Sequence, residues 1–346
     1  MNTLRNKALL GLLGGLLAFY LAGCDFLGTS DASDETGLFP VQIDGRWGYI
    51  NGEGRITIEP VFREAGLFVE GRARARLDGR RGFINAAGDF ISEPHFESTL
   101  DFSNGLASVR VEGRWGFVDR SGNLTIAPRF RKACPFSEGR AFVLTEENGW
   151  EYINSEGQII RSENTPEFRE LEESAFSGGL ALIKNHEGIF GFINRTGDPV
   201  ITPQFSTAKP FSDGYAAVKI SDRWGYIDKD KVFLINPRFI AAGDFHEGLA
   251  PVRENTNTWG YINQQGEMVI PPRFEEARSF SGDRAAVMLN GRWGYIDTEG
   301  AWIRDPEFAE ATRFTQGLGR VRLDVGEARR YGYIDRAGRY VWYPSD

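Results

Sequence analysis

The sequence is poor in the residues that build metal and nucleophilic sites. It has only two cysteines and three histidines in 346 residues. His95, His186 and His246 are separated along the chain, and none has a cysteine or second histidine at a metal-ligand spacing. The two cysteines, at 24 and 134, cannot form a disulfide framework if one is modified, so stability must come from packing. Because a phosphate-binding glycine loop and a nucleophile elbow are also missing, we expect no enzyme, metal or cofactor.

Positive charge is also scarce. Lys and Arg number 40 against 48 Asp and Glu, which gives a formal net charge of −8. An acidic chain is a poor partner for nucleic acid. In contrast, 42 glycines occur with 26 Phe, 11 Tyr and 8 Trp, and after residue 24 long Leu/Ala-rich stretches are few. This composition favours short strands joined by tight turns over helices.

The N-terminus has the features of an export signal. Arg5 and Lys7 precede an apolar run from 8 to 23. That run is short for a membrane-spanning helix, which needs about 20 apolar residues. Residues 1–23 are therefore predicted to be a signal peptide.

The sequence LAGC at residues 21–24 resembles the lipobox of bacterial lipoproteins. The resemblance implies cleavage before Cys24 and acylation of its thiol, which would anchor the protein to a membrane. Asp25 resembles the signal that retains lipoproteins in the inner membrane, which would make the protein face the periplasm. Residues 24–38 are acidic and rich in Ser, Thr and Gly, so we expect a flexible linker.

From residue 39 to 346 one unit of about 34 residues recurs nine times. Such a period is typical of arrays in which each unit buries its faces against its neighbours. The units align on a dipeptide, whose copies are Trp47-Gly48, Arg81-Gly82, Trp115-Gly116, Trp150-Glu151, Phe190-Gly191, Trp224-Gly225, Trp259-Gly260, Trp293-Gly294 and Tyr331-Gly332.

These units resemble WG repeats, a bacterial family named for this dipeptide. The resemblance covers nearly all of the expected mature chain and implies a β-rich module without a common catalytic activity. Four copies depart from the signature, because Arg81, Phe190 and Tyr331 replace Trp and Glu151 replaces Gly. Since the large ring tolerates Phe or Tyr, we interpret it as core filling rather than a ligand grip.

Each unit predicts a three-stranded meander. The strand containing WGYI is apolar on both faces. An Asx residue stands four positions after the Trp, usually with a Gly three positions further on, and this pair predicts a hairpin turn. The next strand should stop at a Pro-x-Phe segment, since proline cannot donate to a ladder. Nine whole meanders with unsplit ends favour an open, twisted β-solenoid; a closed propeller-like ring is the alternative.

Two features are candidates for recognition. The first strand of the meander is repeatedly basic on its polar face, at Arg74, Arg76, Arg110, Lys219, Arg253, Arg320 and Arg322. Stacked side by side, these residues could bind a carboxylate- or phosphate-bearing partner, although charge on a strand also prevents edge pairing. The second feature is the insertion at 161–174, where the repeat lengthens; insertions in arrays often mark a binding face, or simply drift in a tolerant loop.

The combined prediction is a membrane-anchored envelope lipoprotein whose repeat array is a scaffold for binding another envelope protein. The alternative is a module that binds glycan or peptidoglycan through exposed aromatic rings. The exposure of the repeated tryptophans separates the two predictions, because rings buried between units cannot stack on sugars.

Overall fold

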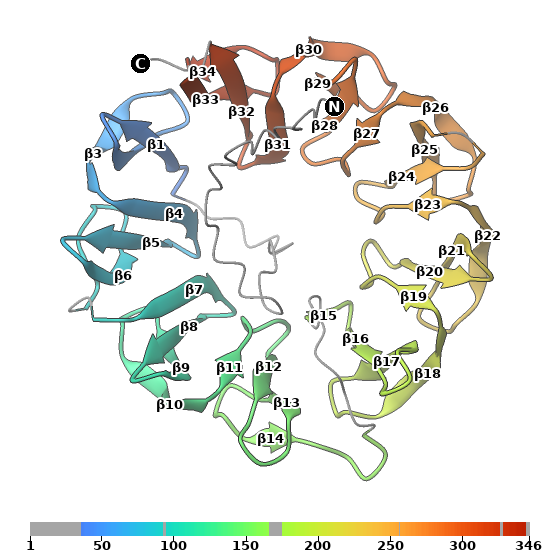
Figure 1. Ribbon diagram of the computed structural model, residues 1–346, viewed down its shortest axis with the longest axis horizontal. Helices are drawn as coiled ribbons and strands as arrows, with labels where there is room; N and C mark the ends of the chain where they lie inside the picture. The colour runs from blue at the N-terminus through green and yellow to red at the C-terminus, as the bar shows by residue number, and fades with distance from the viewer. Residues whose placement is uncertain (1–35, 93–94, 166–174, 256, 326–327, 344–346) are drawn as a thin grey trace, which may run out of the picture.

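The computed structural model describes residues 36–92, 95–165, 175–255, 257–325 and 328–343. Within these ranges the chain forms strands and turns, with no helix. The strands make nine antiparallel sheets, which stand as blades around a closed ring in sequence order (Figure 1). The prediction of an all-β array of nine repeats is therefore confirmed.

The blades are numbered here in chain order, and their strands run from the centre of the ring outward. Blade 1 comprises β1 (Phe39–Ile43), β2 (Arg46–Ile50) and β3 (Ile56–Phe62). Blade 2 comprises β4 (Glu64–Val69), β5 (Arg72–Leu77) and β6 (Arg80–Ile84). Blade 3 comprises β7 (Ser98–Ser103), β8 (Leu106–Val111), β9 (Arg114–Asp119) and β10 (Leu124–Phe130). Blade 4 comprises β11 (Lys132–Ala133), β12 (Ala141–Leu144), β13 (Trp150–Ile153) and β14 (Ile159–Ile160). Blade 5 comprises β15 (Phe176–Ser177), β16 (Leu180–Lys184), β17 (Phe190–Asn194) and β18 (Pro199–Phe205). Blade 6 comprises β19 (Thr207–Ala208), β20 (Ala216–Ile220), β21 (Arg223–Ile227) and β22 (Phe233–Phe239). Blade 7 comprises β23 (Ala241–Ala242), β24 (Leu249–Arg253), β25 (Trp259–Asn263) and β26 (Met268–Phe274). Blade 8 comprises β27 (Glu276–Ala277), β28 (Ala285–Leu289), β29 (Arg292–Ile296) and β30 (Trp302–Phe308). Blade 9 comprises β31 (Glu310–Thr315), β32 (Leu318–Val325), β33 (Ala328–Asp335) and β34 (Tyr340–Trp342).

The expectation of three strands per unit is wrong for most blades. Blades 3 to 9 each have four strands, because the predicted connector contributes an innermost strand such as β11 or β19. These inner strands can be as short as two residues. A segment this short has no detectable alternation, so its strand character depends on pairing with the neighbouring strand rather than on local sequence.

The preference for an open solenoid is also wrong, since the ring closes. Phe39, Val41 and Ile50 of blade 1 pack against Leu318 and Tyr333 of blade 9 in one buried cluster. The Tyr333 hydroxyl also donates a hydrogen bond of 2.9 Å to the Pro40 carbonyl. The described part of the chain therefore closes the ring through a packed and hydrogen-bonded interface between blades 9 and 1, and within it no sheet combines strands from the two ends of the chain.

The core lies between blades rather than within them. Tyr49 on β2 packs with Phe68 and Ala75 of blade 2, together with Ile84 on the facing side of that blade. The third residue of the signature thus faces the next blade, and the residue after it faces the previous one. The tyrosine hydroxyl donates to a carbonyl of the next blade in a recurring pattern: Tyr49 to Gly66, Tyr226 to Gly243, Tyr261 to Arg278, Tyr295 to Thr312 and Tyr333 to Pro40.

The signature glycine gives room for the outermost strand. A Cβ added to Gly225 would lie 2.6 Å from the Ile235 carbonyl oxygen and 2.7 Å from the Pro237 nitrogen. The register between β21 and β22 shifts there, because β22 bulges across the glycine and continues past the proline to Phe239. The expectation that pairing ends at the proline is therefore wrong, and Phe239 at the end of this strand is completely buried.

Blade 4 lacks this glycine. Glu151 occupies the position, and its outermost strand is reduced to β14, two residues long. The Glu151 side chain is only 1% exposed, and its sole charged neighbour among the described residues is Arg161 at 3.3 Å. Burial raises the pKa of this carboxyl, although Arg161 opposes the effect.

Strand alternation separates two faces of the ring. The turns from the first to the second strand and from the third to the fourth lie at one end, which we call the constant face. The turns from the second to the third strand, and the connections to the next blade, lie at the other end, which we call the variable face. Because blade 1 has no described innermost strand, its β1 and β2 correspond to the second and third strands of the four-stranded blades. The variable-face turns span 44–45, 78–79, 112–113, 221–222 and 290–291, but lengthen to 145–149 and 185–189, and the segment that joins Arg253 to Trp259 is longer as well.

Candidate functional site

The predicted Asx turns form the constant face. In all nine blades the Asx Oδ1 accepts backbone N–H bonds from residues two and four positions later, as Asn51 does from Glu53 and Arg55 at 3.0 Å. The same pair of bonds is made by Asn85, Asp119, Asn154, Asn194, Asp228, Asn263, Asp297 and Asp335. The side chain thus replaces ladder bonds at a tight reversal.

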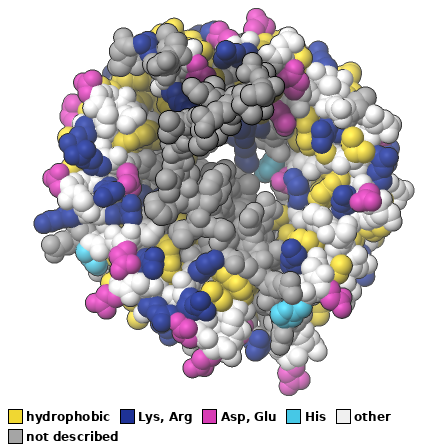
Figure 2. Space-filling view, in the orientation of Figure 1, with side chains coloured by type: hydrophobic (Ala, Val, Ile, Leu, Met, Phe, Trp, Pro, Cys, Tyr) yellow, Lys and Arg dark blue, Asp and Glu magenta, His cyan; other side chains and the backbone are white. Residues whose placement is uncertain are grey.

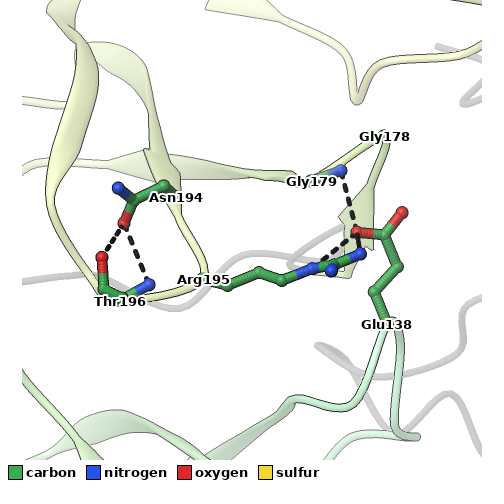
Figure 3. Close-up of a pocket in the computed structure, with 6 residues that line it drawn as sticks. All are labelled: Glu138, Gly178, Gly179, Asn194, Arg195 and Thr196. Atoms are coloured by element: carbon green, nitrogen blue, oxygen red, sulfur yellow. Dashed lines mark hydrogen bonds and ion pairs between the residues drawn. The ribbon is translucent and has the colours of Figure 1, made fainter.

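A pocket of about 550 Å³ opens between blades 4 and 5 on this face (Figure 3). Glu138 comes from the turn before β12 and reaches the next blade, where its Oε2 accepts from Gly179 N at 2.8 Å and Arg195 Nη2 at 2.6 Å. Arg140 donates in return to the Arg195 carbonyl at 3.1 Å. Asn194 is committed to its own turn through Thr196.

The same clasp joins blades 2 and 3. Glu70 accepts from Gly105 N and Arg120, and Arg72 donates to the Arg120 carbonyl. In the pocket of Figure 3 the charges of Glu138 and Arg195 already neutralise each other, so the pocket offers a ligand few unsatisfied polar groups. Its residues therefore fasten adjacent blades, which sequence reasoning missed even though the Glu-Gly-Arg triplet at 70–72 and 138–140 was a visible signal.

The predicted basic residues lie in blades 2, 3, 6, 7 and 9, distributed around the ring rather than in one stripe. Acidic and basic side chains are interspersed around the face shown in Figure 2. Several of the predicted residues have acidic neighbours: Arg74 with Asp101, Arg76 with Glu64, Arg110 with Glu97, Lys219 with Asp222, and Arg322 with Glu310 and Asp324. Arg253 instead stacks over the Trp259 ring at 5.0 Å.

Arg320, like Arg253, lies against aromatic rings rather than an acidic side chain. Its guanidinium carbon lies 4.2 Å from the centre of the Tyr331 ring and 5.8 Å from that of Trp47. Within the described part of the chain its side chain makes no ion pair. It lines a second pocket, of about 370 Å³, at the junction of blades 9 and 1.

The signature rings are largely covered. Trp115 and Trp293 are 4% and 9% exposed, and Trp47, Trp224 and Trp259 are half-buried. The following glycines, Gly48, Gly116, Gly225, Gly260 and Gly294, face the outermost strand of their own blade. The interpretation of the signature as a core element is consistent with this burial, and a continuous aromatic platform for sugars loses its main support.

Other predicted features fall outside the described ranges. These are the signal peptide at 1–23, Cys24, Asp25 and the linker up to residue 35, together with 166–174 of the insertion. The described start of the insertion, 161–165, follows β14 on the variable face.

Among the described residues, no group of three His, Cys, Asp or Glu side chains is placed to hold a metal ion. No helix long and apolar enough to cross a bilayer occurs in the same ranges.

An all-β ring of nine blades built from one repeated unit defines a β-propeller. A family model described as "WG containing repeat" matches residues 47–80, 82–115, 115–150, 190–224, 224–256, 259–293 and 293–324. These matches cover more than half of the chain, which therefore belongs to the WG-repeat family. The resemblance at the Trp-Gly dipeptide is confirmed.

Among solved structures, the computationally designed protein Ika8 is 12% identical, with a TM-score of 0.48 over 80% of this chain and 94% of that one. BamB from Moraxella catarrhalis is also 12% identical, with a TM-score of 0.41 over 84% of this chain and 94% of that one. No curated protein sequence matches the chain.

Proposed function

We propose that the propeller is a non-catalytic scaffold that binds another protein of the bacterial envelope through its variable face. The observation that supports this proposal is the contrast between the two faces. The Asx turns of the constant face repeat the same bonds in every blade, whereas the opposite turns change in length and residue type. Binding residues are commonly found on variable loops held by a rigid framework.

The anchor in this proposal is the acylated Cys24. Cleavage after Gly23 would leave a lipid-bearing cysteine and an acidic linker before the first blade at Phe39. Several acyl chains hold a protein to a bilayer more firmly than a single chain does. Asp25 favours the periplasmic side of the inner membrane. Cys24→Ala is expected to release the protein from the membrane fraction, and unchanged membrane association would refute the anchor.

The partner face is tested by site-specific photocrosslinking in intact cells. One crosslinker is placed at Asn290, an exposed residue in a variable-face turn of blade 8, and a matched control at Glu299, exposed on the constant face of the same blade. We expect a crosslinked protein from position 290 and little from 299. Equal yields, or recovery of lipid and glycan only, would contradict the proposal.

Mass spectrometry of the crosslinked product identifies the partner. Deleting residues 161–174 and substituting Arg110→Glu then test the insertion and the predicted basic strand separately. Loss of the crosslink in either variant assigns that element to the interface, provided that the variant keeps the thermal midpoint of the wild type.

A further inference from the structure

The junction of blades 9 and 1 carries a cationic pocket with aromatic walls. Trp47 and Asp44 come from blade 1, while Arg320, Arg329, Tyr331 and Trp342 come from blade 9. Its volume of about 370 Å³ is within the range of small-ligand sites. The β32–β33 hairpin that forms one wall is longer than the equivalent hairpins, with eight residues in each strand against five in β28 and β29.

Arg320 has a counterpart in blade 2. Arg74 pairs across its sheet with Phe83 as Arg320 pairs with Tyr333. The guanidinium of Arg74 binds Asp101 on the inner strand of the next blade through two bonds, of 2.6 and 3.1 Å. For Arg320 the next blade is blade 1, in which the described residues contain no inner strand before β1. The described chain therefore supplies no equivalent of Asp101.

The two aromatic rings hold the Arg320 guanidinium in place without using its N–H groups. Stacking engages the flat faces of the cation, which leaves the five donors at its edge for an acceptor. Among the described residues, none accepts a side-chain hydrogen bond from Arg320. Arg329 is exposed on the neighbouring hairpin strand and adds positive charge to the same pocket. A guanidinium fork fixed in this way is suited to bidentate binding of a carboxylate.

We infer that this pocket binds the carboxylate of an acidic segment of a partner polypeptide, with Trp47, Tyr331 and Trp342 covering the apolar side chains beside it. The inference rests on the proposed function and deepens it, because the pocket includes the variable-face turn residues Asp44 and Gly45. In a protein with a net charge of −8, a local cationic pocket also selects among partners by charge.

The test is calorimetric titration of the full chain in detergent with two capped tetrapeptides. One alternates phenylalanine and glutamate, and the other has glutamine in place of glutamate. We expect the acidic peptide to bind and the glutamine peptide to bind at least about tenfold more weakly, since a charge-assisted hydrogen bond is lost. Arg320→Gln and Arg329→Gln should each weaken binding of the acidic peptide. Arg292 is an exposed arginine of the equivalent hairpin in blade 8, and Arg292→Gln should leave this binding unchanged.

Several outcomes would overturn the inference. These are equal binding of the two peptides, equal losses in all three arginine variants, and no binding at millimolar peptide. Inorganic phosphate is the third titrant, and binding of phosphate alone with the same dependence on Arg320 would replace the polypeptide by a free anion. Arg329 is exposed, so its variant keeps the test decisive if Arg320→Gln unfolds the junction.

The crosslinking experiment separates this inference from the proposed function. If Arg320→Gln still captures the partner at position 290 with unchanged yield, the pocket assignment fails and the scaffold remains. If the acidic peptide binds but no partner protein is captured from cells, the scaffold fails and the pocket remains.

Discussion

The signature glycine can be tested by adding a single methyl group. In Gly225→Ala the new Cβ would lie 2.6 Å from the Ile235 carbonyl oxygen and 2.7 Å from the Pro237 nitrogen. Ordinary contact begins at 3.4 Å, so strand β22 would have to withdraw by about 0.8 Å. The neighbours are backbone atoms and cannot rotate away as a side chain would. Gly225 does not have a positive φ, so backbone strain adds nothing to the steric overlap.

Overpacking of a core costs typically 1–3 kcal/mol, and we expect Gly225→Ala to lower the free energy of unfolding by about 3 kcal/mol. The assay is urea unfolding at 25 °C, followed by tryptophan fluorescence and by circular dichroism. Gly52→Ala is the matched control, because Gly52 has open space around its Cβ position and no positive φ. That control should be neutral or stabilise by up to about 1 kcal/mol. The steric account is refuted if the two variants are equally stable.

Substitutions at three further contact positions, with their controls, test other parts of the structure. Glu151→Gln should stabilise the protein at neutral pH by about 1 kcal/mol or more, because it removes a buried charge. Since burial raises the pKa of Glu151, that gain should shrink as the pH falls from above the raised pKa to below 4.5, where the wild-type carboxyl is protonated in both the folded and the unfolded state. Thermal midpoints across this range measure the change, and a gain that grows on acidification contradicts it. Tyr333→Phe should lower the free energy of unfolding by about 1–2 kcal/mol, because it removes the hydrogen bond to Pro40 across the ring junction. Tyr343→Phe, at an exposed tyrosine, is the control. Burial raises the pKa of Tyr333 to about 12, so wild-type stability should fall from pH 10 to 12 as the unfolded tyrosine ionises first, and an equally steep fall in Tyr333→Phe would argue against this tyrosine as a source. Asp119→Ala should cost about 1–2 kcal/mol at pH 7, whereas Asp119→Asn should be nearly neutral because asparagine makes the same turn bonds in other blades. Although partial burial opposes ionisation, the hydrogen bonds from Asn123, Ser121 and Gly122 hold the pKa of Asp119 below its usual value. The contribution of Asp119 to stability should therefore be lost as the pH falls below about 4. Chemical unfolding at pH 3 and pH 7 measures this loss.

The sequence by itself determined the local unit. The Asx residues at a fixed distance from Trp47 and its equivalents predicted the turns, because the bonds of an Asx turn join residues only two and four positions apart. Alternation in WGYI predicted a strand buried on both faces, and the structure places Tyr49 against the next blade and Ile50 against the previous one. These relations depend on neighbours in the chain, so they can be read from one repeat.

Tertiary structure alone decided how the units assemble. The inner strands, such as Ala241–Ala242, are too short to carry a pattern and form only because the adjacent strand supplies pairing partners. Ring closure depends on a small rotation at each blade interface, which accumulates over eight interfaces until Tyr333 meets Pro40 at the ninth, 293 residues away in sequence. The junction pocket follows from the same closure. Arg320 resembles the paired Arg74 in sequence, and only the ring shows that the neighbouring blade adds the Trp47 ring opposite Tyr331 of its own blade, with no counterpart of Asp101 among the described residues.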